Sequence, residues 1–114
     1  MRMWMVDPSL LCSVHLRGEH VECHMLVGCL QRDKRLTGYV RKGLIDTTQL
    51  YPRHEQLAKE LVHRGMQHKS PLPLVNVIPQ GHVDTEESLQ ELCRRCPRCR
   101  ARITKYYRSI RREV

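Results

Sequence analysis

The stretch that decides the fold is DPSLLCSVHLRGEHVECHMLVGCLQR, residues 7–32. Asp7 followed by Pro8 is a typical helix start, because Asp accepts hydrogen bonds from free N–H groups and Pro lacks only an N–H that would stay unbonded there. Apolar residues then recur at intervals of three and four, which predicts a long helix over residues 8–32. Gly18 and Gly28 oppose this prediction, because Gly disfavours a helix by roughly 1 kcal/mol relative to Ala.

A second helix is predicted over residues 52–64, with Gly65 as its C-terminal cap. The sequence that follows cannot be helical throughout, because proline breaks the hydrogen-bond ladder of a helix. It therefore predicts an extended connection over the surface. The prolines of this stretch are Pro71, Pro73 and Pro79.

A third helix is predicted from Asp84, with Glu87 three residues later as in a capping box, and Pro97 is expected to end it. Residues 33–50 indicate a loop or a single helical turn, and the segment after Pro97 has no assigned structure. No alternating strand pattern is present. We expect an all-α fold in one compact domain, residues 1–114, with three main helices.

The composition predicts a modest core and no membrane span. The 114 residues include no Phe, and aromatic residues make up 4%, so Leu, Val and Met must fill most of the interior. No apolar run approaches the ~20 residues that cross a bilayer. The first residues also lack the basic and apolar pattern of a signal peptide. We expect a soluble cytoplasmic protein.

The net charge of +8 lies entirely at the C-terminal end. Residues 1–92 hold eleven Lys/Arg and eleven Asp/Glu, whereas residues 93–114 hold nine Lys/Arg and one Glu. Eight of those nine are Arg, which forms forked contacts with phosphate. The basic segment 94–114 therefore predicts a polyanion-binding surface, with nucleic acid as the expected polyanion. A solvated basic tail is the alternative.

The spacing of His15, Glu19 and Glu22 places them on one face of the first predicted helix. One interpretation is an ordinary solvated helix surface. The other is a catalytic carboxylate whose neighbours set its protonation.

The sequence resembles a known family at this point. The opening MRMW, the run HLRGEHVE (15–22), the HRG at 63–65 and the KYY at 105–107 resemble the pyrimidine-dimer DNA glycosylases with AP-lyase activity, the phage endonuclease V family. Residues 1–22 match that family without a gap. The resemblance implies an all-α domain that acts on damaged double-stranded DNA without a cofactor. We expect a nucleoid-associated monomer with no obligate protein partner.

The resemblance also implies roles for individual residues. Met1 corresponds to the nucleophilic N-terminal residue and Glu22 to the essential carboxylate, while Arg2, His15 and Glu19 correspond to family residues around them. An α-amine has a pKa of about 7.7–8.0 against ~10.4 for a lysine, so a useful fraction is neutral and nucleophilic at neutral pH. The bulky Arg2 predicts that the initiator Met is retained.

Some residues depart from the family pattern. Val21 and Met25 occupy positions of arginines that grip the DNA in the phage enzyme, and Val14 replaces a polar residue. The DNA lesion that is recognised could therefore be a pyrimidine dimer, another damaged base or an abasic site. The remaining residues expected to contact DNA are Arg94, Arg95, Arg98, Lys105 and Tyr106. For Tyr106 and Tyr107, closing the small core is the alternative.

The run CRRCPRC (93–99) has C-x2-C-x2-C spacing, which suits zinc. Cys93, Cys96 and Cys99 are weak candidate ligands, and the fourth ligand could be His82 or a cysteine of the first helix. Plain packing of reduced thiols is the alternative, and the family needs no metal. A non-catalytic, zinc-stabilised nucleic-acid-binding module is the alternative function.

Overall fold

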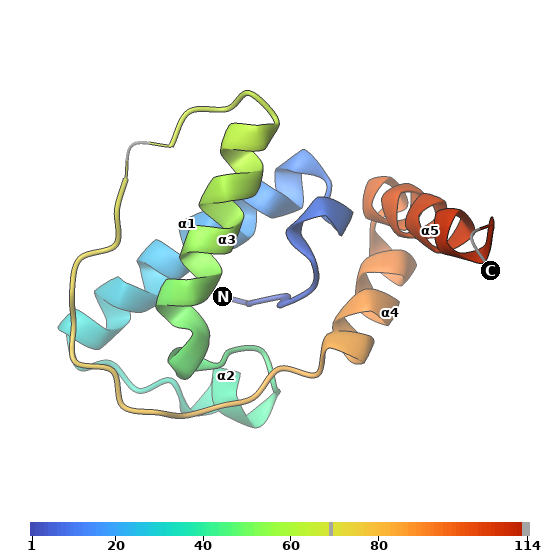
Figure 1. The fold of residues 1–114 in the computed structure, drawn as a ribbon. Coiled ribbons are helices and arrows are strands. Elements are labelled where there is room, and N and C mark those ends of the chain that lie inside the picture. Colours follow the sequence, from blue (N-terminus) through green and yellow to red (C-terminus); the bar gives the residue numbers. More distant parts are fainter. Residues whose placement is uncertain (69, 113–114) are drawn as a thin grey trace.

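The computed structural model describes residues 1–68 and 70–112, and this part of the chain holds only helices and connections (Figure 1). The all-α prediction is therefore confirmed. The 3-10 helices are η1 (Pro8–Leu10) and η2 (Thr47–Gln49), and the α-helices are α1 (Ser13–Gln31), α2 (Thr37–Arg41), α3 (Leu50–His63), α4 (Thr85–Arg95) and α5 (Pro97–Arg112). No helix in this part of the chain has the length and apolar character needed to cross a lipid bilayer.

The single helix predicted over residues 8–32 is wrong at its start. Asp7 does cap a helix, accepting from the Ser9 N–H at 3.0 Å, but that helix is the three-residue η1. Leu11 is extended, and α1 begins only after Cys12. The guanidinium of Arg64 donates to the Leu11 carbonyl at 2.7 Å, so a side chain from the end of α3 satisfies a backbone group that the break leaves free.

The C-terminal segment, which had no assigned structure, is the 16-residue helix α5. Pro97 stands at its first position, where its fixed φ and missing N–H are tolerated. The preceding helix α4 is capped by Asp84, whose carboxylate accepts from the Glu86 and Glu87 N–H groups at 2.9 and 3.2 Å. The third predicted helix is thus confirmed, and Cys96 is the extended residue between it and α5.

One apolar cluster joins the N-terminal segment to four α-helices. Helix α1 packs chiefly on α3, α4 packs on α5, and α5 also contacts η1. Met3 and Trp4 are buried in this cluster, and the Met3 N–H donates to the Leu44 carbonyl at 2.7 Å. In the view of Figure 1 the N-terminus lies among the helices and does not extend beyond them. The fold therefore fixes the first residues in place.

The predicted extended connection runs around the outside of the molecule from α3 to α4 (Figure 1). The Tyr51 hydroxyl holds it, donating to the Pro73 carbonyl at 2.7 Å and accepting from the Val75 N–H at 2.9 Å. Gly81 has a φ of +88° and forms an isolated bridge with Asp46. A Cβ at Gly81 would overlap the backbone of Ile45, so glycine allows the close approach that returns the chain to the body.

Candidate active site and neighbouring clusters

The carboxylate of Glu22 lies beside the first residues of the chain. Glu22 is half-buried on α1, and burial raises its pKa. The Arg2 backbone N–H and the N-terminal ammonium both act in the opposite direction and lower that pKa. Met1 itself is half-buried against the core. The fold therefore brings together the chain's amine end and a carboxylate from the first long helix.

Arg2 and Trp4 form the next part of this region. The Arg2 guanidinium stacks over the Trp4 ring, 4.0 Å from its centroid, and the Arg95 guanidinium lies 5.2 Å from the same ring. Burial lowers the pKa of Arg2 most, followed by the charge of Arg95, while Glu91, Glu22 and Glu87 raise it. Two guanidiniums thus meet at one aromatic ring near Glu22, which suits contact with a phosphate.

Glu19 takes a different place from its helix neighbour Glu22. It is 1% exposed, and its two carboxylate oxygens accept from the Arg53 Nε and Nη2 atoms at 2.6 and 2.9 Å. Arg53 also donates to the Val6 carbonyl at 2.6 Å. A buried carboxylate with both oxygens bonded to a guanidinium does not reach DNA. We therefore propose a positioning role for Glu19 in place of the DNA contact expected from the sequence.

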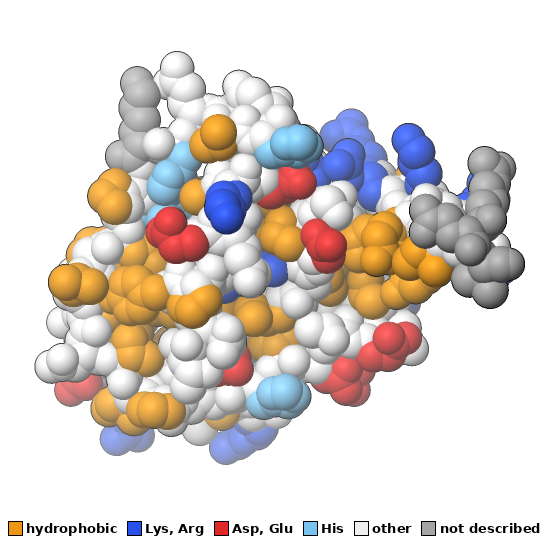
Figure 2. All heavy atoms as spheres, in the orientation of Figure 1, with side chains coloured by type: hydrophobic (Ala, Val, Ile, Leu, Met, Phe, Trp, Pro, Cys, Tyr) orange, Lys and Arg blue, Asp and Glu red, His pale blue; other side chains and the backbone are white. Residues whose placement is uncertain are grey.

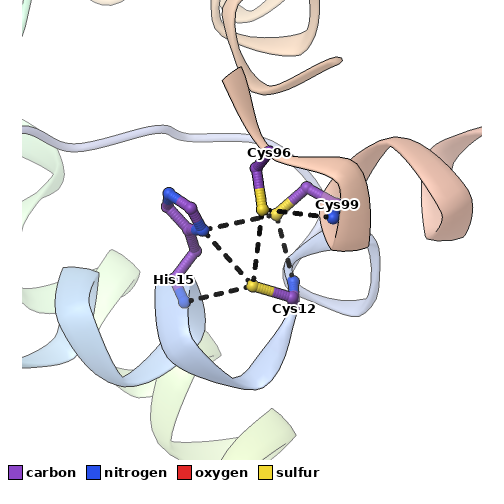
Figure 3. Close-up of side chains that lie close together, drawn as sticks. All are labelled: Cys12, His15, Cys96 and Cys99. Atoms are coloured by element: carbon purple, nitrogen blue, oxygen red, sulfur yellow. Dashed lines mark hydrogen bonds between the residues drawn. The ribbon is translucent and has the colours of Figure 1, made fainter. Parts of the chain in front are cut away.

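His15 belongs to a cluster of thiols (Figure 3). Its Nδ1 atom lies 3.3 Å from the Cys12 Sγ and 3.6 Å from the Cys99 Sγ, and the Cys96 Sγ lies 3.9 Å from that of Cys12. We call Cys12, His15, Cys96 and Cys99 the Cys/His cluster. The His15 ring also packs against Trp4 in an edge-to-face arrangement, with 5.7 Å between ring centroids. The residue expected to bind substrate therefore faces thiols on one side and Trp4 on the other.

The Cys/His cluster changes the ligand set expected from the sequence. Cys96, Cys99 and Cys12, a cysteine of the first predicted helix, are among the four residues whose ligand atoms converge, whereas Cys93 and His82 are not. The other pair is Cys12-x2-His15, at the start of α1 and 81 or more residues away along the chain. This pair has the same spacing as Cys96-x2-Cys99, a signal that could have linked them had the break before α1 been predicted.

The other cations expected to bind DNA lie on α4 and α5. Arg94 and Arg95 both donate to the carboxylate of Glu91, and these hydrogen bonds lower the pKa of Glu91 to about 2. Arg98 and Lys105 are exposed on α5. In Figure 2, Lys and Arg side chains gather at the upper right, over the region of α5, with hydrophobic side chains below them. Two tyrosines of α5 are also exposed, Tyr106 at 43% and Tyr107 at 45%, so they do not close the core.

Four histidines gather between α1 and α3, a group that sequence analysis missed. His20 and His24 come from α1, His54 from α3 and His68 from the connection that follows. The Nε2 atoms of His54 and His68 lie 3.3 Å apart, and the His20 ring stacks on that of His54 at 4.7 Å. The only sequence signal is the four-residue spacing of His20 and His24, which puts them on one helix face. Their partners come from a distant element.

Comparison with known families supports the resemblance in the N-terminal two-thirds of the chain. A family model described as pyrimidine dimer DNA glycosylase matches residues 1–74. That range contains α1 with Glu22, all of α3 and the histidine group, whereas α4 and α5 lie beyond it. No curated protein and no solved structure matches the sequence.

Proposed function

Since this chain belongs to the pyrimidine dimer DNA glycosylase family, we propose that it excises damaged bases from duplex DNA and then nicks the strand through a Schiff base on Met1. Such an enzyme would act in the cytoplasm on nucleoid DNA, as a monomer and without a catalytic cofactor. The proposal requires that the chain begin at Met1 with a free amine.

The observation that carries the proposal is the position of Glu22 beside the amine end of the chain. The N-terminal ammonium and the Arg2 N–H both act on the Glu22 carboxylate, while burial keeps it partly out of water. The Met3–Leu44 hydrogen bond and the buried Met3 and Trp4 side chains hold the residues just after the amine. A nucleophile and a carboxylate held in this way need little reorganisation when DNA binds.

The chemistry follows from these two groups. The neutral amine attacks C1′ of the damaged nucleotide, the bond from C1′ to the base breaks, and the base leaves with a proton. The sugar ring opens to give an iminium on the Met1 nitrogen. Glu22 stabilises the positive charge and accepts the C2′ proton, and the 3′ phosphate then leaves by β-elimination. Water finally hydrolyses the imine and frees the amine.

The residues of the site define the DNA lesion less closely than they define the reaction. Three apolar side chains on α1 are exposed, Val14 at 63%, Val21 at 54% and Met25 at 51%. An apolar surface cannot bind phosphate, so we propose that the grip on the DNA backbone comes from Arg2, Arg95 and the cations of α5. Damaged or weakly paired bases are the natural targets, because they cost least to turn out of the duplex.

The test is borohydride trapping on DNA that carries an abasic site. The protein is expected to form a covalent adduct, and peptide mass spectrometry should place the adduct on the Met1 nitrogen. An adduct on a lysine, or an adduct of equal yield after N-terminal acetylation, would reject the role of Met1.

The role of Glu22 is tested with Glu22→Gln, which keeps the shape of the side chain and removes its charge. We expect strand cleavage to fall at least about 100-fold, in line with the usual contribution of a general base. Glu86→Gln, an exposed change on α4, is the matched control and should cleave like the parent protein. Cleavage by Glu22→Gln at the control rate, with an unchanged melting temperature, would reject the assignment.

The second candidate function is a non-catalytic nucleic-acid-binding module stabilised by zinc, which the Cys/His cluster favours. It predicts salt-dependent binding to DNA without any trapped adduct. The borohydride experiment therefore separates the two functions directly.

A further inference from the structure

The turn between α4 and α5 meets the start of α1 at the Cys/His cluster (Figure 3). We propose that Cys12, His15, Cys96 and Cys99 bind one Zn²⁺ ion in a tetrahedral site, and that this ion fastens the junction of α4 and α5 to the rest of the fold. The inference stands on these four residues and does not depend on the proposed enzyme activity.

Three of the six distances between the four ligand atoms lie close to those around a single zinc ion. With Zn–S bonds of about 2.3 Å and a Zn–N bond of about 2.0–2.1 Å, a tetrahedron has S···S edges of about 3.8 Å and S···N edges of about 3.6 Å. The Cys12 and Cys96 sulfurs are 3.9 Å apart, and the His15 Nδ1 is 3.3 and 3.6 Å from the sulfurs of Cys12 and Cys99. All four atoms lie within 4.8 Å of one another.

Backbone N–H groups surround the sulfurs as they surround metal-bound thiolates. The His15 N–H points at the Cys12 Sγ at 3.5 Å, the Cys99 N–H at the Cys96 Sγ at 3.4 Å, and the Cys12 N–H at the Cys99 Sγ at 3.2 Å. Each of the three sulfurs thus accepts one backbone N–H. Such hydrogen bonds orient the ligands and stabilise their negative charge. The spacing of Cys12-x2-His15 and Cys96-x2-Cys99 creates two of these bonds, because the fourth residue of each run places its N–H over the first sulfur, and the third bond joins the two runs.

The surrounding charge also fits the ion. Three thiolates, one neutral imidazole and Zn²⁺ carry a net charge of −1, and the surface depression beside the cluster is lined by Arg95 and Arg98. All six cysteines are free thiols, and three of them belong to the Cys/His cluster. Of the three outside it, Cys29 and Cys93 are half-buried. Within residues 93–99, the proposed site therefore includes Cys96 and Cys99 and leaves out Cys93.

The site would join a part of the chain that lies inside the family match to a part that lies outside it. Cys12 and His15 lie inside the matched residues 1–74, whereas Cys96 and Cys99 lie beyond them. A zinc ion there would fix the position of α5, with its cations, relative to α1. It would also fix the His15 ring, which packs against Trp4, the ring over which Arg2 stacks.

The first test measures metal directly. The protein, purified without chelator, should contain about one zinc per chain, and the Co²⁺-substituted protein should show the visible absorption of tetrahedral, thiolate-bound cobalt. Cys12→Ser and Cys99→Ser should lose most of the bound metal, whereas Cys93→Ser and Cys29→Ser should retain it. Loss of zinc in Cys93→Ser together with full retention in Cys12→Ser would overturn the proposed ligand set. Absence of both zinc and the cobalt absorption from the parent protein would overturn the site.

A second test uses the unmodified chain, in case Cys12→Ser fails to fold. Iodoacetamide is applied to the zinc-loaded and chelator-treated protein, and mass spectrometry locates the alkylated cysteines. We expect zinc to slow alkylation of Cys12, Cys96 and Cys99 at least tenfold and to leave Cys93 and Cys29 unchanged. Equal protection of Cys93, or no protection of Cys12, would contradict the proposal.

Discussion

The imidazole of His20 lies against three others. Its ring centroid is 4.7 Å from that of His54, 4.8 Å from that of His68 and 5.1 Å from that of His24. Its Nε2 atom is buried, with no hydrogen-bond partner among the described residues. Burial first, and then the charges that His54, His68 and His24 would carry, lower the pKa of His20 from 6.5 to about 4. The folded protein therefore keeps this ring neutral.

Stability should consequently fall in mild acid. The folded pKa of His20 lies below the unfolded value, so the unfolded state takes up the proton first as the pH drops. The contribution of His20 is constant above pH 6.5 and declines between pH 6.5 and about pH 4. The full shift corresponds to about 3 kcal/mol, and solvent screening at the half-buried ring reduces this to about 1–2 kcal/mol.

Urea unfolding between pH 7.5 and pH 4.5 measures this loss. His20→Gln should show a shallower decline than the parent protein, whereas His63→Gln, an exposed change on α3, should follow the parent curve. The comparison between variants also subtracts other acid-sensitive groups that face His20 and its neighbours, including Glu55, whose carboxylate lies 3.2 Å from His54. Identical slopes for the parent and His20→Gln would contradict the assignment.

At the scale of elements, the Glu19–Arg53 pair is the main polar link between α1 and α3. It is fully buried, and Arg53 also reaches the Val6 carbonyl, so one guanidinium joins two helices and the N-terminal segment. The segment leading from Met1 is thereby held at the helix that carries Glu22. Glu19 therefore helps to hold the N-terminal segment in position through Arg53.

Breaking this pair should destabilise the fold strongly. Removing one partner leaves an uncompensated buried charge, which costs about 3–5 kcal/mol. We expect that loss for Glu19→Gln in equilibrium unfolding, and a much smaller change for the exposed Glu86→Gln. The double variant Glu19→Leu, Arg53→Met should be more stable than either single variant, because it removes both charges. A loss below 1 kcal/mol for Glu19→Gln would show that water reaches the pair.

The features that could be predicted from the sequence are those that depend on residues close to one another in the chain. Caps and apolar spacing are local, so the N-terminal cap at Asp84, the end of α3 before Gly65 and the shared helix of Glu19 and Glu22 could be predicted. The difference between those two carboxylates could not, because Arg53 is 34 residues from Glu19. The break before α1 was missed for the same reason, since its carbonyls are satisfied by Arg64. For the Cys/His cluster, Cys96, Cys99 and a cysteine of the first helix were candidates from the sequence, but the choice of Cys12 together with His15 depends on how α5 packs against the start of the chain.

At the scale of the whole molecule, the charge is divided between two regions. Residues 1–92 are neutral overall and contain the proposed active-site carboxylate, whereas α5 carries most of the net positive charge. Arg102 of α5 donates to the Ser9 carbonyl at 2.9 Å, which ties the helix to η1. Five further cations of α5 are exposed to solvent, namely Arg98, Arg100, Lys105, Arg108 and Arg111. The helix therefore offers a long basic surface fixed to the rest of the fold.

Binding to undamaged duplex DNA should accordingly depend on salt through α5. Each phosphate contact contributes about −0.9 to the slope of log K against log salt concentration. Lys105→Ala and Arg108→Ala, both exposed on α5, should each reduce the slope by about 1 without changing the melting temperature. Lys34→Ala, an equal change of charge in the exposed turn after α1, is the control and should leave the slope unchanged. If Lys34→Ala reduced the slope as much as the α5 variants, binding would follow net charge alone, and α5 would not be the DNA-binding surface.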